Sequence, residues 1–258
     1  MTSDTAVVSA ASAAGGEASC ARGSRAAESG LWGLWAALLF GGFLFGVFAG
    51  DEGQRMPAST RLGSSAVLVV AAWGWLAAAW STRAKPYSLG LAVGMTLGFV
   101  GDLFNWQGNT LGGIIAFGIG HISYIAAQVW ANRAGNLTTS GRLLGAIVVW
   151  QLIGLVAWAF VVWPGTQATE LRVPALPYSL LLAGTTGVAM GLALGDRRFW
   201  GLAAGAVLFL VSDFILAFRI FHGPFAMAGD AVWLSYGPGQ MLIVYSVPSA
   251  VAALARKT

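Results

Sequence analysis

Long runs of apolar residues dominate this sequence, and polar residues are concentrated in the short stretches between them. A bilayer core about 30 Å thick is crossed by a helix of roughly 20 apolar residues. We therefore predict an all-α fold, a polytopic membrane helix bundle in residues 31–258. Its eight transmembrane helices are expected at 32–49, 65–82, 87–104, 111–131, 143–163, 176–195, 199–221 and 231–255.

Residues 1–30 have a different pattern, because Ala, Ser and Gly replace the long apolar runs. A segment of this composition cannot bury enough apolar surface to fold. We predict a disordered cytoplasmic tail over 1–30. It contains Cys20, the only cysteine, so no internal disulfide can form.

Composition agrees with a membrane protein. The chain is 57% hydrophobic and only 9% charged, whereas soluble domains carry about 25% charged residues. So few charges cannot cover a water-facing surface for 258 residues. A soluble globular fold is therefore excluded.

The basic residues are distributed unequally between the two ends of the predicted helices. Of the 14 Lys and Arg, ten fall on the side that holds both termini. The other side holds only Arg55, Arg61, Arg172 and Arg219. Cytoplasmic loops are enriched in Lys and Arg, so we predict a cell-membrane protein with cytoplasmic N- and C-termini. This bias also accounts for the net charge of +4, so no nucleic-acid partner is expected.

Two segments of the chain resemble each other at an offset of 111 residues. Residues 90–102 and 201–213 share Gly, Leu, Ala and Val positions, and each segment ends in an aspartate, Asp102 or Asp213. In the following helices, Ser-Tyr-x-x-x-Gln occurs at 123–128 and at 235–240. We predict a four-plus-four duplication whose parallel halves are related by an axis along the membrane normal.

Apart from Arg219, which is counted at the end of its span, three ionisable residues lie inside the predicted spans: Asp102, His121 and Asp213. Such residues are costly in a bilayer and are functional candidates, although a buried Asp can also serve only to link helices. The repeat places the two aspartates at matched depth, and we expect them to face each other across a central cavity. Tyr124 shares a helix face with His121.

The last predicted helix carries a second polar face and several helix-breaking residues. Tyr236 and Gln240 are four residues apart and so lie on one face. We expect the segment 237–239, Gly-Pro-Gly, and Pro248 to break or bend this helix and open backbone groups toward the cavity.

The residue inventory excludes several kinds of membrane site. The only lysines, Lys85 and Lys257, lie at the ends of spans, so no buried lysine can bind retinal. Two histidines are too few for a three-His zinc centre. We expect no metal and no cofactor.

Five motifs follow one another along the predicted helices. They are Lys85-Pro86, Gly101-Asp102, Phe117-x-x-x-His121-x-x-Tyr124, Gly205-Ala206-x-x-Phe209-x-x-Ser212-Asp213-x-x-x-Ala217 and Tyr236-x-x-x-Gln240. In this order, over about residues 30–255, they resemble the lysoplasmalogenase (YhhN-like) family of membrane proteins. Tyr178, at the start of the sixth predicted helix, also resembles a family position.

The resemblance implies a hydrolase that cleaves the vinyl ether bond of a lysophospholipid substrate within the bilayer. Its products would be a fatty aldehyde and a glycerophospho-head group. Asp102 and Asp213 would be the acid–base pair, with neither role assigned. The supporting residues would relay protons or orient water and substrate, and they are His121, Tyr124, Tyr178, Ser212, Tyr236 and Gln240.

Two other functions are compatible with the same residues. A proton-coupled transporter would also need paired intramembrane aspartates and a broken helix. A non-catalytic lipid-binding or scaffold protein would tolerate the loss of both aspartates. The oligomeric state is not encoded in any of these patterns.

Overall fold

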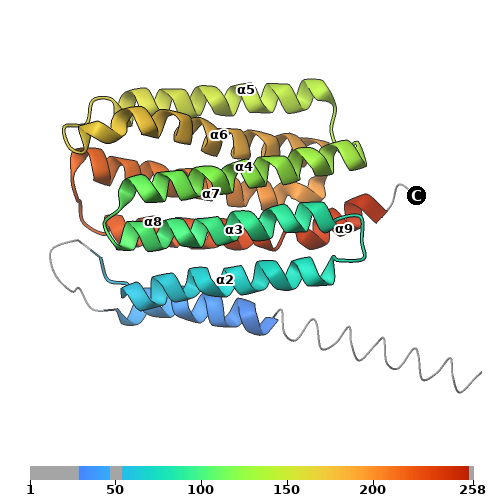
Figure 1. Cartoon of the computed structure of the whole chain (residues 1–258), viewed down its shortest axis with the longest axis horizontal. Helices are drawn as coiled ribbons and strands as arrows, with labels where there is room; N and C mark the ends of the chain where they lie inside the picture. Colours follow the sequence, from blue (N-terminus) through green and yellow to red (C-terminus); the bar gives the residue numbers. More distant parts are fainter. Residues whose placement is uncertain (1–28, 47–53, 256–258) are drawn as a thin grey trace, which may run out of the picture.

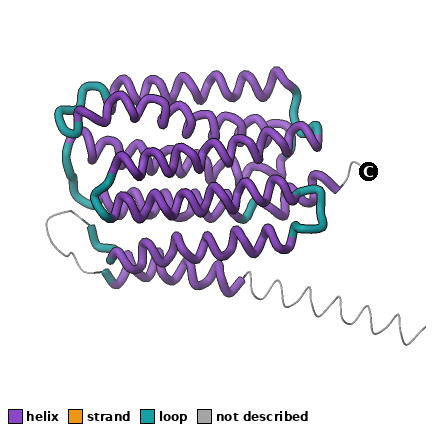
Figure 2. The backbone as a smooth tube through the Cα atoms, viewed as in Figure 1, coloured by secondary structure: helices purple, strands orange, loops and turns teal. Residues whose placement is uncertain are grey.

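A computed structural model describes residues 29–46 and 54–255 as a bundle of long helices that lie side by side and alternate in direction along the chain (Figure 1). Short loops join the helices at the two ends of the bundle (Figure 2). The helices are an N-terminal helix (Ser29–Phe45), α2 (Ala58–Ala78), α3 (Lys85–Trp106), α4 (Thr110–Gly135), α5 (Ser140–Ala157), α6 (Arg172–Gly195), α7 (Trp200–His222), α8 (Ala228–Val244) and α9 (Val247–Ala255).

The all-α membrane bundle predicted from the sequence is confirmed. The described residues contain no strand, and seven of their helical segments are long and apolar enough to cross a membrane. In that count α8 and α9 together form one segment, Ala228–Ala255. The N-terminal helix is apolar but has only 17 residues, Ser29–Phe45. The predicted tail lies outside the described residues, apart from its last two.

Local sequence signals explain where the helices start. The side chain of Asn109 accepts the Gly112 N–H at 2.9 Å and caps α4. Pro86 occupies the first turn of α3, where its missing N–H costs nothing. Helix α2 begins directly after Pro57, seven residues before the predicted start. Its first two turns therefore include Arg61, which the sequence pattern had assigned to a loop.

The prediction of a break at residues 237–239 is wrong. Helix α8 runs through Pro238, and the chain is interrupted at 245–246 instead, just before Pro248. The close approach of Gly239 on α8 to Gly205 on α7 explains why α8 continues through Pro238. A Cβ on Gly239 would lie 2.9 Å from the Gly205 carbonyl oxygen, so α8 packs directly against α7. That contact holds α8 against α7 at the point where glycine and proline would weaken an isolated helix.

The order of helix contacts is similar in the two halves of the chain. Helices α3 and α4 pack closely together, and so do α7 and α8. Helix α4 also contacts α6, and α8 contacts α2. A parallel duplication would produce this order, but the internal repeat itself stays a prediction.

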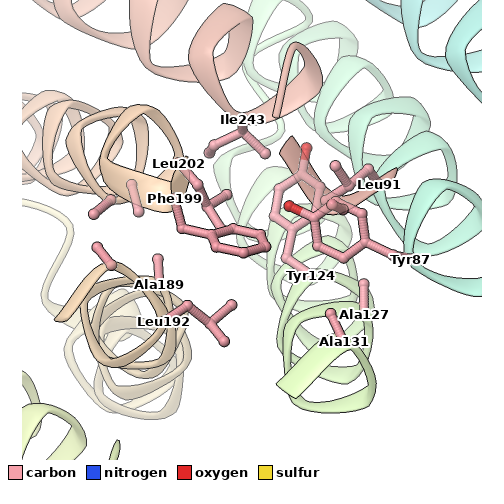
Figure 3. Close-up of a cluster of buried hydrophobic side chains, with 14 of the residues drawn as sticks. Tyr87, Leu91, Tyr124, Ala127, Ala131, Ala189, Leu192, Phe199, Leu202 and Ile243 are labelled. Atoms are coloured by element: carbon pink, nitrogen blue, oxygen red, sulfur yellow. The ribbon is translucent and has the colours of Figure 1, made fainter. Parts of the chain in front are cut away.

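The two ends of the bundle differ in chemistry. Toward the end that holds the described C-terminal residue, Ala255, large apolar side chains from α3, α4, α6 and α7 fill the interior. Figure 3 shows Phe199, Leu192 and Leu202 converging on Tyr124 and Tyr87 from the opposite side. All five side chains are almost fully buried. Toward the other end, the interior becomes polar.

Candidate functional site

A cavity of about 580 Å³ lies in the polar half of the bundle. Both Asp102 and Asp213 line it, from α3 and α7 respectively. Both side chains are buried, with 6% and 9% of their surface exposed. The structure therefore brings the two predicted carboxyl groups to the wall of one cavity, as the repeat indicated.

Two hydroxyl groups converge on one oxygen of Asp102. Ser65 Oγ on α2 donates to Asp102 Oδ2 at 2.6 Å. The Tyr236 hydroxyl on α8 donates to the same oxygen at 3.1 Å. Hydrogen bonds to a carboxylate are stronger than those between neutral groups, so this carboxyl group ties α2 and α8 to α3.

Asp213 has a similar but simpler environment. The Tyr178 hydroxyl on α6 donates a hydrogen bond to Asp213 Oδ2. Ser212, the preceding residue, is fully buried and also lines the cavity. In each half of the chain, therefore, a hydroxyl group on one helix binds the aspartate on the next helix. The sequence separations are 37 residues for Ser65–Asp102 and 35 for Tyr178–Asp213.

A chain of hydrogen bonds extends from Asp102 to α4. Gln240 Nε2 donates to the Tyr236 hydroxyl at 3.3 Å, and the Tyr124 hydroxyl donates to Gln240 Oε1 at 2.9 Å. Tyr124 and Gln240 are 1% and 0% exposed. Their polar groups are therefore satisfied by each other, and the chain fixes the position of the Tyr236 hydroxyl.

His121 lies deeper than the cavity wall. Its Nδ1 is 3.0 Å from Thr185 Oγ1 on α6, while its buried Nε2 has no hydrogen-bond partner among the described residues. The ring packs 4.8 Å from that of Phe209 and 5.9 Å from that of Tyr178, measured between centroids. His121 therefore contacts the tyrosine that holds Asp213, without contacting the cavity.

Glycines on α3 make room for these side chains. A Cβ on Gly94 would lie 2.2 Å from the Tyr124 ring, and one on Gly101 would lie 2.6 Å from the Phe117 ring. A Cβ on Gly98 would lie 3.1 Å from Gln240 Nε2. The glycine face of α3 is thus a packing device, and what it accommodates is the site itself.

The open part of the cavity is polar and carries positive charge. Arg61 on α2 and Arg219 on α7 line it, together with Gln54. Arg61 also packs over the Trp233 ring, 5.7 Å from its centroid. The carboxyl group of Asp102 lies within electrostatic range of both Asp213 and Arg61. Carboxyl groups are therefore deep in the cavity, and guanidinium groups lie closer to the end of the bundle.

The sequence analysis missed a fourth buried ionisable residue, Asp230, because the predicted helix begins at residue 231 and leaves Asp230 in a loop. It is fully buried in the first turn of α8. Its two carboxylate oxygens accept the backbone N–H groups of Arg55 and Met56, at 2.7 and 2.9 Å. Asp230 therefore fixes the segment 54–56, which includes the cavity residue Gln54.

Of the predicted site residues, four line the cavity and four lie behind it. The first group is Asp102, Ser212, Asp213 and Tyr236. The second group is His121, Tyr124, Tyr178 and Gln240. No group of three or more metal-binding side chains occurs within 29–46 and 54–255.

The residues missed by sequence analysis are Ser65, Arg61, Arg219, Gln54 and Asp230. The position of Ser65 could have indicated a role in the site, because this polar residue belongs to an apolar span and is four residues after Arg61. Nothing in the sequence pattern paired it with Asp102, since that contact depends on how α2 packs against α3.

Comparison with known proteins gives a consistent result. The YhhN family model matches residues 60–247. A curated relative, lysoplasmalogenase TMEM86B of Sus scrofa, is 32% identical over 162 residues, which cover 62% of this chain and 64% of the relative. The match therefore spans less than two thirds of the relative's length. No solved structure matches this chain.

The position of Asp230 predicts that it protects two backbone amides. Replacing Asp230 with Asn leaves a neutral group that accepts more weakly, so the segment 54–56 should open more often. Hydrogen bonds to a charged group contribute about 1.5–3 kcal/mol. We expect hydrogen exchange at the Arg55 and Met56 amides to become roughly 10- to 100-fold faster. Asp196→Asn, at the other end of the bundle, is the control and should leave both amides slow. Unchanged exchange in Asp230→Asn would refute this role.

Proposed function

The chain belongs to the YhhN family, and from this membership and the paired carboxyl groups we propose that it is a membrane-embedded lysoplasmalogenase-like hydrolase. In this proposal it cleaves the vinyl ether bond of a lysoplasmalogen. The products are a fatty aldehyde and a glycerophospho-head group. The name of the Sus scrofa relative supports the substrate class.

The observation that carries the proposal is that two buried carboxyl groups line one cavity, each held by hydroxyl groups from neighbouring helices. A purely structural aspartate would have its oxygens enclosed by the helices that it links. Asp102 and Asp213 instead present part of their surface to a space that a substrate can enter.

Vinyl ether hydrolysis needs one proton donor and one group that stabilises positive charge. A carboxylic acid delivers a proton to the β-carbon of the C=C–O unit, and the α-carbon becomes part of an oxocarbenium ion. Water adds to the α-carbon and loses a proton to a carboxylate, giving a hemiacetal. The hemiacetal breaks its bond to the glycerol oxygen, which leaves as a hydroxyl group, and the aldehyde remains. Positioned acids and bases each contribute about 10²–10⁴-fold to such steps.

We assign the ionised role to Asp102 and the acid role to Asp213. Two hydroxyl donors converge on Asp102 Oδ2, and the guanidinium group of Arg61 lies within electrostatic range of this carboxyl group. Tyr178 and Ser212 are the hydroxyl groups beside Asp213. The nearby positive charge of Arg61 therefore favours a negative charge on Asp102. Two close carboxyl groups in a poorly solvated cavity readily adopt opposite protonation states.

The remaining site residues act through these two carboxyl groups. Tyr236 positions Asp102, and Gln240 and Tyr124 in turn hold the Tyr236 hydroxyl. Tyr178 positions Asp213. His121 packs against Tyr178 and can relay protons only through that side chain. These contacts support positioning roles rather than direct contact with the substrate.

The proposal favours a hydrolase over the proton-coupled transporter that the same aspartates allowed. Family membership and the named relative both point to lipid chemistry. The seven long apolar helices make this a multi-pass membrane protein. We also propose that it lies in the cell membrane with cytoplasmic termini, so that the cavity opens on the opposite side.

Removing either carboxyl group should abolish turnover. We expect purified protein in detergent to release aldehyde from a lysoplasmalogen and not from an ester lysolipid. Asp102→Asn and Asp213→Asn should each lower kcat by about 10²–10⁴-fold, because each loses one half of the acid–base pair. The control is Glu170→Gln, an exposed carboxylate that does not line the cavity. Near-normal aldehyde release by folded Asp variants would exclude the proposed mechanism.

The assignment of roles predicts different responses to acid. The variant Asp213→Asn lacks the proton donor but keeps the carboxylate, so hydronium ions can partly replace the donor. Its aldehyde release, above the uncatalysed rate, should rise with hydronium concentration as the pH falls, until Asp102 itself becomes protonated and the rate levels off. Asp102→Asn should show no such recovery. The opposite pattern would exchange the two roles.

The proposed orientation predicts the behaviour of reporter fusions. Alkaline phosphatase is active only outside the cytoplasm, whereas green fluorescent protein exported by the general secretory route does not fluoresce. We therefore expect a C-terminal fluorescent protein fusion to be bright and a phosphatase fusion there to be inactive. A phosphatase inserted in the loop between α3 and α4, near Gly108, is the reciprocal control. The reverse result would place the cavity opening in the cytoplasm.

A further inference from the structure

Two arginines lie at the end of the bundle that has few basic residues, so the enrichment of Lys and Arg at the opposite end does not explain them. Within residues 29–46 and 54–255, only four arginines and no lysine lie at the end of the bundle where the cavity opens, and Arg61 and Arg219 line that cavity. Each comes from a helix that also supplies the deep site. Arg61 is four residues before Ser65 on α2, and Arg219 is six residues after Asp213 on α7.

A buried amide group beside the arginines provides a second, independent observation. Gln54 also lines the cavity and is only 9% exposed. Its Nε2 has no hydrogen-bond partner among the described residues. The side chain is held in place, because a Cβ on Gly229 would lie 2.7 Å from Gln54 Cδ. A buried donor without a partner costs about 1–3 kcal/mol, so this arrangement favours a ligand that accepts a hydrogen bond.

We propose that Arg61, Arg219 and Gln54 bind the phosphodiester group of the lysolipid substrate. The proposal rests on the proposed function and deepens it. It identifies the phosphate as the feature that the cavity recognises, and it makes these three side chains specificity-determining residues. Arginine suits this role, because its planar guanidinium group donates paired hydrogen bonds to phosphate oxygens.

The spacing of the groups agrees with the size of the substrate. Five bonds separate the vinyl ether oxygen of a lysoplasmalogen from its phosphorus atom. With bonds of about 1.5 Å joined at tetrahedral angles, the extended connection spans roughly 6 Å from end to end. The four residues from Ser65 to Arg61 give a rise of about 6 Å along α2, and the six from Asp213 to Arg219 give about 9 Å along α7. A phosphate held by the arginines therefore places the vinyl ether near the carboxyl groups.

The positions of the carboxyl and guanidinium groups also determine how the substrate is oriented in the cavity. A phosphate is repelled by the ionised carboxylate of Asp102 and attracted by the guanidinium groups of Arg61 and Arg219, which lie closer to the end of the bundle. The oxocarbenium ion has the opposite sign and is stabilised beside the carboxylate. Lys85 cannot provide the phosphate site, because it lies at the far end of the bundle and packs on Trp80, 3.4 Å from the ring centroid.

A pair of substrates tests this directly. The first is a lysoplasmalogen, and the second is 1-alkenylglycerol, which has the same vinyl ether but no phosphate. We expect Arg61→Gln and Arg219→Gln each to lower kcat/KM for the lysoplasmalogen by about 10- to 100-fold. Turnover of 1-alkenylglycerol should fall much less than turnover of the lysoplasmalogen. Arg197→Gln, an exposed arginine at the far end, is the charge-matched control and should affect neither substrate.

Equal losses on both substrates would mean that the arginines only support the fold, and no loss on either would mean that the phosphate binds elsewhere. Both results would overturn the proposal.

A binding measurement separates this proposal from the proposed hydrolase activity. The probes are 1-alkyl-glycerophosphoethanolamine, which has no vinyl ether to cleave, 1-alkylglycerol, and inorganic phosphate. We expect the phospholipid analogue to raise the melting temperature of the wild-type protein more than the other two. This extra stabilisation should be lost in Arg61→Gln, in Arg219→Gln and in Gln54→Leu. Failure of the protein to release aldehyde from a lysoplasmalogen would refute the proposed hydrolase activity but not the phosphodiester site. Equal stabilisation by both alkyl lipids, or by phosphate alone, would refute the phosphodiester site.

Discussion

The structure depends on the cost of burying two carboxyl groups inside a membrane-spanning bundle. Water is scarce there, so hydrogen bonds must come from other helices. Ser65 and Tyr236 supply them to Asp102, and Tyr178 supplies one to Asp213. These contacts fix α2, α6 and α8 around α3 and α7. The glycines of α3 follow from the same constraint, because the tyrosine and glutamine side chains need space between closely packed helices.

The division of the bundle into an apolar half and a polar half explains how such a site remains stable. Large side chains such as Phe199 and Leu202 pack tightly in one half and hold the helices together. The other half can therefore contain a cavity of about 580 Å³ without losing its shape. Asp230 reinforces that half by anchoring the segment that carries Gln54. The cavity thus combines two buried carboxyl groups with two guanidinium groups nearer the end of the bundle.

Sequence patterns identified the parts of the site that repeat or that are costly in a membrane. Asp102 and Asp213 were found because charge inside an apolar run is rare, and Tyr236 and Gln240 because of their helical spacing. Arg61 and Asp230 were missed because they lie near helix ends, where polar residues are expected in loops. The break expected at 237–239 is absent because close contact with α7 outweighs the local preference of the sequence. Local sequence does not encode such packing between helices.

The most direct test of the central claim is to follow the proton that the protein delivers to the vinyl ether. In D₂O the aldehyde should carry one deuterium on the carbon next to the carbonyl group, in a single configuration, when it is reduced immediately to the alcohol. A single configuration is predicted because a fixed carboxyl group can reach only one face of the double bond. Equal amounts of both configurations, or aldehyde without deuterium, would contradict protonation by a positioned aspartate.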